Sequence, residues 1–177
     1  GSIVLAGAVV DARESQLNIR TRGDVNHVVL DYSVVAAKAD VAIENEAEIS
    51  LEGAAVASRE GKITTASTGA MNVKGAEVNA REIRFVNQGD IYANGAAITA
   101  SDNQLELMAR GNPGTLVADN ASLWAKNRIL LEVGDAAGTV SVSGASLTSQ
   151  SSTVRAAPDC VTVFGTPTTG TITNGCD

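Results

Sequence analysis

Three glutamates alternate along one short segment, and they form the densest group of candidate ligand or acid–base side chains in the sequence. Glu44, Glu46 and Glu48 occupy every second position of IENEAEI. In an extended strand alternate residues share a face, so these carboxylates would point the same way. Carboxylate oxygens suit Ca²⁺, and two carboxylates roughly 5–9.5 Å apart suit glycoside cleavage. A row of acids facing water explains the same residues, so we expect no cofactor and keep Ca²⁺ as the alternative.

A second group of side chains is basic and recurs at one fixed place in a repeated phrase. Its members are Arg13, Lys38, Arg59, Arg81 and Lys126, and Trp124 belongs to the neighbouring outward row. Stacked strands lie about 4.8 Å apart, a spacing at which like charges repel. Acids such as Glu14, Glu60 and Asp102 follow directly in the sequence. The basic row is therefore either a self-compensated, solvated edge or a contact surface for an anionic glycan.

Other chemical groups are sparse. His27 is the single histidine and lies in no recognisable triad or zinc-binding motif. We therefore predict no catalytic residue and no metal site. The net charge of −7 weighs against polyanionic partners, so we expect no nucleic acid. The tripeptide Arg22-Gly23-Asp24 matches an integrin-binding motif, but matches of this length are frequent by chance.

The repeated phrase defines the elements that position these side chains. It returns seven times, with first residues Gly7, Tyr32, Gly53, Gly75, Gly95, Asn120 and Gly144. Its aliphatic anchors are Val10, Val35, Val56, Val78, Ile98, Leu123 and Leu147, which lie 20 to 25 residues apart. A repeat of this length is typical of a solenoid, in which each repeat stacks on its neighbours.

Each repeat alternates apolar and polar residues, which is the period of a strand with one buried face. In GAEVNARE, Val78 and Ala80 fall on one side, and Glu77, Asn79 and Arg81 fall on the other. A shorter alternating run precedes each phrase and another follows it. Three strands per coil of about 23 residues predict an all-β fold, a single-stranded parallel β-helix of about seven coils.

The first residue of the phrase predicts the corner geometry. Glycine stands there in most copies and asparagine in one, Asn120, which indicates a backbone with positive φ. Tyr32 breaks this rule, so we expect that corner to differ.

The coils are predicted to span residues 3–154, followed by a C-terminal cap segment over 155–177. Cys160 and Cys176 lie in this segment, and we predict a disulfide between them. A loop of that length would stabilise the fold by roughly 3 kcal/mol and indicates an oxidising compartment. We see no membrane-spanning segment, no signal peptide before Gly1-Ser2 and no N-terminal cap. The first coil therefore either continues a longer solenoid or docks on another chain.

The coil sequence GAEVNAREIRFVNQGDIYANGAAITASDNQLEL resembles bacterial secreted β-helices of the filamentous-haemagglutinin and adhesin type. The resemblance covers residues 3–154 and is one of pattern. It implies a right-handed helix, export to the cell surface, and adhesion or anchoring through a surface glycan or another surface protein.

From these observations we expect a non-enzymatic, extracellular adhesin or anchoring module. One alternative is a structural subunit that associates end to end, through its coil faces, into a surface fibre. The other alternative is a carbohydrate-active enzyme, since many such enzymes use solenoids and a fold does not fix an activity.

Overall fold

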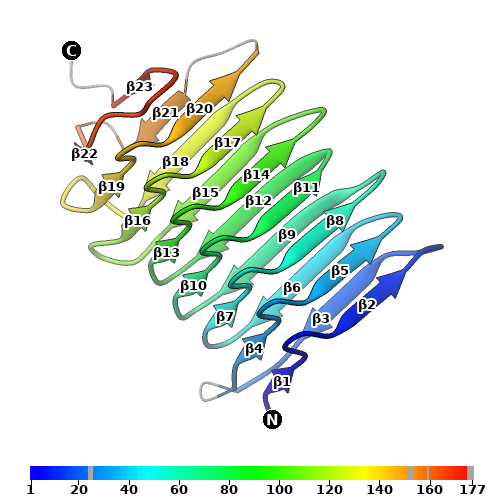
Figure 1. The fold of residues 1–177 in the computed structure, drawn as a ribbon. Coiled ribbons are helices and arrows are strands. Elements are labelled where there is room, and N and C mark those ends of the chain that lie inside the picture. The colour runs from blue at the N-terminus through cyan, green and yellow to red at the C-terminus, as the bar shows by residue number, and fades with distance from the viewer. Residues whose placement is uncertain (24–25, 151–153, 159, 175–177) are drawn as a thin grey trace.

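The chain winds into a parallel β-solenoid, shown as a computed structural model in Figure 1. The structure describes residues 1–23, 26–150, 154–158 and 160–174. These segments contain strands and no helix, and every strand pair in the three sheets is parallel. The predicted fold, a parallel β-helix of about seven coils, is confirmed.

Each coil contributes one strand to each sheet. Sheet A consists of β1 (Ile3–Val4), β4 (Val28–Val29), β7 (Ile49–Ser50), β10 (Met71–Asn72), β13 (Ile91–Tyr92), β16 (Thr115–Val117), β19 (Thr139–Ser141) and β22 (Thr162–Phe164). Sheet B consists of β2 (Val9–Ala12), β5 (Val34–Ala37), β8 (Ala55–Ser58), β11 (Glu77–Ala80), β14 (Ala97–Ala100), β17 (Ser122–Ala125) and β20 (Ser146–Ser149). Sheet C consists of β3 (Leu17–Arg20), β6 (Val41–Asn45), β9 (Lys62–Ser67), β12 (Glu82–Asn87), β15 (Leu105–Ala109), β18 (Ile129–Val133), β21 (Val154–Ala157) and β23 (Ile172–Thr173). Coil 1 is β1–β3, coil 2 is β4–β6, and so on to coil 7, β19–β21.

The core consists of inward side chains stacked in register between coils. The anchors predicted from the phrase pair directly, for example Val56 with Val78 and Val78 with Ile98. From Val35 to Leu147 these anchors are at most 2% exposed. Burial of one such side chain contributes about 1.5–3 kcal/mol. Stacking of the coils places each aliphatic anchor against the aliphatic anchors of the neighbouring coils. The alternation in the sequence therefore translates directly into the interior of the solenoid.

The corner between sheets A and B has positive φ at glycine and asparagine, as predicted. Gly53 has φ 62° and Asn120 has φ 56°. The prediction that Tyr32 would form a different corner is wrong, because its φ is 55°. Tyr32 N donates to Glu52 O at 2.8 Å, as Gly53 N donates to Lys74 O at 2.9 Å in the next coil. The stacking of coils on one another therefore imposes the same backbone on a residue that disfavours it.

The ring of Tyr32 lies over Gly53, and this contact yields a testable prediction. A Cβ at Gly53 would come within 2.6 Å of the ring, whereas a Cβ at Gly75 would meet nothing within 4 Å. Both glycines have φ 62°. We expect Gly75→Ala to lower the free energy of unfolding by about 1 kcal/mol through backbone strain alone, and Gly53→Ala to lower it further. In a Tyr32→Asn background, urea denaturation should give the two alanine variants the same loss in free energy of unfolding. If Gly53→Ala still loses more than Gly75→Ala, the Tyr32 ring does not cause the difference.

The strands continue into the segment predicted as a cap. β21 extends sheet C, β22 extends sheet A, and β23 pairs with β21. Val161 and Ala156 are buried against the coils. Cys160 belongs to this segment, but Cys176 lies outside the described residues, so the disulfide between them stays a prediction. In the described part of the chain, no helix is long and apolar enough to cross a membrane.

Candidate ligand-binding groove

The basic row predicted from the phrase follows the edge of sheet B, but its members have different partners. Arg13 pairs with Asp11, and Arg81 and Lys126 both pair with Asp102. Hydrogen bonds from Arg81 and Lys126 hold the pKa of the Asp102 carboxyl below its usual value. In contrast, neither the side chain of Lys38 nor that of Arg59 has an ion pair among the described residues.

Trp124 lies in the outward row of sheet B, at the register position given by the repeated phrase. It pairs with Thr99 on one side and Thr148 on the other, and it is half-buried. Its neighbours differ from coil to coil in size and polarity, so sheet B offers no regular aromatic platform in its described strands.

The three alternating glutamates turn outward, but each carboxylate has a different partner. Arg20 lies 2.6 Å from Glu44, Gly23 N donates to Glu46, and His27 Nδ1 is 3.8 Å from Glu48. No three His, Cys, Asp or Glu side chains of the described residues are grouped so that they could hold one metal ion.

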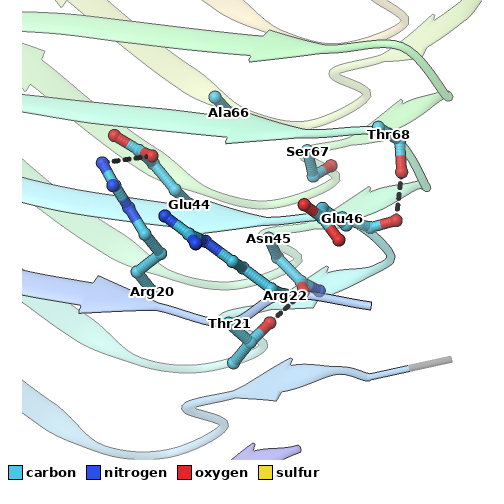
Figure 2. Close-up of a pocket in the computed structure, with 9 residues that line it drawn as sticks. All are labelled: Arg20, Thr21, Arg22, Glu44, Asn45, Glu46, Ala66, Ser67 and Thr68. Carbon is cyan, nitrogen blue, oxygen red and sulfur yellow. Dashed lines mark hydrogen bonds and ion pairs between the residues drawn. The ribbon is translucent and has the colours of Figure 1, made fainter. Parts of the chain in front are cut away.

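A polar groove crosses the outer face of sheet C in coils 1–3 and continues to the turn that leads into sheet A. Its central hollow has a volume of about 320 Å³ and is lined by Arg20, Arg22, Glu44, Glu46, Ala66 and Thr68. Figure 2 shows Arg20 joined to Glu44, with Arg22 extending across the hollow. A second hollow shares Arg20 and Glu44 with it, and a third shares Glu46 and Thr68. The three hollows therefore adjoin one another, and together we call them the polar groove.

Strand register explains why the sheet is hollowed here. Arg20 on β3 pairs with Glu44 on β6, which pairs with Ala66 on β9. Ala42 occupies an outward position on β6 and lines the second hollow. Because alanine is short, Ala42 and Ala66 leave space beside the paired side chains of Arg20 and Glu44.

Buried polar side chains lie on the inward side of the same turns. Asn45 accepts a hydrogen bond from Thr21 Oγ1 and donates through Nδ2 to Glu48 O at 2.6 Å. In the equivalent turn of coil 3, Ser67 donates to Gly69 O, two residues further along the chain, at 3.0 Å. These bonds fix the turn backbone beneath Glu46 and Thr68, since buried polar groups are costly unless they are paired.

The groove combines hydrogen-bond donors and acceptors on a floor of small residues. Arg20 and Arg22 can donate, and Glu44 and Glu46 can accept. The Thr68 hydroxyl donates to Glu46 O, so its oxygen can accept from a ligand. The guanidinium of Arg22 has no hydrogen bond or ion pair among the described residues, so it is free to bind a ligand. This mixed donor and acceptor lining suits a ligand rich in hydroxyl groups.

The outer surface of the central coils is occupied by its own ion pairs. On sheet C, Glu106 pairs with both Arg84 and Arg128, and Arg110 pairs with Glu132. The side chain of Glu106 is only 6% exposed although it points outward. The open polar surface of sheet C therefore lies in the first three coils.

Sequence reasoning placed Glu44, Glu46 and Glu48 on one row but did not identify the groove. The sequence did place Ala42 and Ala66 at outward strand positions. It did not show which residues of neighbouring coils lie beside them, because the spacing between repeats varies. Comparison of the chain with models of protein families, with curated proteins and with solved structures gave no match.

Proposed function

We propose that this protein is a non-enzymatic, extracellular adhesin or anchoring module that binds a glycan in the polar groove. The observation that carries the proposal is the row of adjoining hollows over coils 1–3, with charged and hydroxyl side chains above a floor of alanine and glycine. Glycan hydroxyls both donate and accept hydrogen bonds, so they match this lining. The volume of the central hollow, about 320 Å³, lies within the range of roughly 300–1,000 Å³ common for small-molecule sites.

The repeat architecture favours a polymer as the ligand. Neighbouring coils present Arg20, Glu44 and Ala66 at register positions about 4.8 Å apart. An extended chain lying across the coils would meet the side chains of successive coils in turn. Several weak polar contacts along one chain are the means by which a shallow surface gains affinity.

The existing bonds of the groove carboxylates favour binding over cleavage. Glycoside hydrolysis needs one carboxylic acid that gives a proton and a second carboxylate that attacks or activates water. Glu44 is paired with Arg20, and Glu46 accepts from Gly23 N. In the ligand-free chain both carboxylates thus hold other groups in place, which suits a fixed binding surface.

The location and family type belong to the same proposal. A disulfide between Cys160 and Cys176 would suit an oxidising compartment outside the cytoplasm. The right-handed sense, the export and the adhesin type follow from the resemblance of the coils to secreted haemagglutinin-like helices. Mass spectrometry of alkylated protein, with and without reduction, tests the disulfide directly.

Substitution of Arg22 tests the groove. We expect Arg22→Ala to weaken the binding of a responsive glycan at least tenfold, about 1.4 kcal/mol, because it removes a guanidinium that has no ion pair or hydrogen bond with any described residue. Lys74→Ala is the matched control, since Lys74 is an exposed cation outside the polar groove, with its Nζ over the Tyr92 ring, 5.4 Å from the ring centroid. A glycan array followed by calorimetry on the best ligand provides the measurement.

Two results would contradict the proposal. If no glycan binds, or if both alanine variants bind as tightly as the native chain, the groove is not the site. If the bound glycan is released with new reducing ends, the protein is an enzyme and the non-enzymatic assignment fails.

A further inference from the structure

Sheet B carries an apolar area on coils 1–3, which we call the apolar patch. It consists of Val9, Tyr32, Val34, Ala36, Ala55 and Ala57. In coil 1 the patch is bordered by Asp11, which is in register with Ala36 and is paired with Arg13. Val9 is 75% exposed, Tyr32 67% and Val34 47%. In coil 4 the equivalent outward residues are Glu77 and Asn79, so the patch ends there. Exposed apolar side chains grouped in this way mark an interaction surface.

The apolar patch is bounded by acids on one side and by bases on the other. Asp31 precedes the patch in coil 2 and Lys38 follows it. Glu52 and Arg59 occupy the equivalent positions in coil 3, since Val34 pairs with Ala55. None of these four charged side chains has an ion pair among the described residues.

Tyr32 is a second sign that this surface makes a contact. Its corner requires positive φ, and glycine fills the corresponding corner in five other coils. A bulky residue in this conformation is strained, and such strain is concentrated at functional positions. Here it places an exposed aromatic ring at the border of the apolar patch.

We propose that the apolar patch binds the apolar patch of a second copy of this chain, with the strands of the two copies antiparallel. A two-fold axis that lies between the two sheets, perpendicular to the strands and along the direction in which the coils stack, places the basic edge of each copy over the acidic edge of the other. Asp31 precedes β5 and Lys38 follows it, and the span between them is identical in both copies. Lys38 and Arg59 thus meet Asp31 and Glu52 across the interface, as an isologous contact requires.

The size of the apolar patch sets the strength of this dimer. Three strands of four residues, about 4.8 Å apart and about 13 Å long, cover roughly 190 Å² per copy. This is well below the roughly 800 Å² per partner of a stable complex. The dimer is therefore weak, depends on protein concentration and is sensitive to salt.

The dimer would give the molecule two binding sites. The polar groove lies on sheet C and the turn towards sheet A, so pairing through sheet B leaves both grooves open. This consequence rests on the proposed glycan-binding function, and bivalent binding would raise avidity on a surface. The dimer itself stands on the apolar patch alone.

Sedimentation velocity over a series of protein concentrations, at low and high salt, tests the dimer. The native chain should show a monomer–dimer equilibrium that high salt weakens. Lys38→Glu/Arg59→Glu should raise the dimer dissociation constant at least tenfold, and so should Tyr32→Asn, which keeps a residue type that the same corner accepts at Asn120. Arg59→Glu alone should also weaken the dimer, and equimolar mixing of Arg59→Glu with Glu52→Lys should restore association, because the two substituted positions then face each other with opposite charges and the other edge pairs are unchanged.

A variant with the same change in net charge away from sheet B, Arg22→Glu/Arg110→Glu, is the control and should dimerise like the native chain, because Arg22 lines the polar groove and Arg110 follows β15 on sheet C. A native chain that stays monomeric at every concentration would overturn the proposal. Equal weakening by the control would also overturn it, because net charge rather than the patch would then be responsible. Neither result depends on whether the polar groove binds a glycan.

Discussion

Replacing Phe85 by alanine is expected to lower the free energy of unfolding by about 3–5 kcal/mol. Phe85 is an aromatic ring with no exposed surface, at an inward position of β12. Its register neighbours are Thr65 in coil 3 and Leu107 in coil 5. Thr65 is a small residue stacked against the large ring of Phe85, so the two side chains together fill the space between the coils. Thr65 is also held, by a hydrogen bond to Met71 Sδ at 3.2 Å, and cannot fill the cavity that alanine would leave.

The matched control is Val86→Ala, the next residue on the same strand but on its outward face. Val86 is only partly buried, so its truncation should cost less than about 1 kcal/mol. Urea denaturation followed by far-UV circular dichroism measures both variants. Equal losses would mean that Phe85 is not enclosed between its neighbouring coils.

Most of the fold follows from the sequence because its physical cause is local. An inward anchor such as Val78 needs only a period of two and a buried neighbour, and both are visible in the repeated phrase. The corner at Asn120 follows from the few residue types that tolerate positive φ. Tyr32 could not be predicted in this way, because its conformation is imposed by the hydrogen bond to coil 3 and not by its own preference.

The polar groove could not be predicted because its cause is not local. It needs Arg20, Glu44 and Ala66 in register on three strands, although loops of unequal length separate them in sequence. The inward polar residue Asn45 was missed for a similar reason. It occupies a position that the alternation assigns to the core, and its partners, Thr21 and Glu48 O, become apparent only once the turns are stacked.

The ion pairs over the central coils give the second large effect. We expect Glu106→Gln to lower the free energy of unfolding by about 2–3 kcal/mol. Glu106 is 6% exposed and receives the guanidinium groups of both Arg84, at 3.2 Å, and Arg128. Hydrogen bonds to a charged group contribute about 1.5–3 kcal/mol each, and the glutamine keeps the shape but not the charge. The half-exposed arginines regain some water, which keeps the loss below the sum of two such bonds.

Glu44→Gln is the matched control, because Glu44 makes the same kind of contact on the same sheet with Arg20. In that pair the side chains are 56% and 45% exposed, and exposed pairs contribute about 0–1 kcal/mol. Salt separates the two cases further, since it screens an exposed pair more strongly than a buried one. Unfolding curves at low and high ionic strength should therefore show a large, nearly salt-independent loss for Glu106→Gln and a small, salt-sensitive loss for Glu44→Gln. If the two losses were equal, the burial of Glu106 between Arg84 and Arg128 would add nothing to the free energy of unfolding. The stability of the central coils would then come from their apolar core.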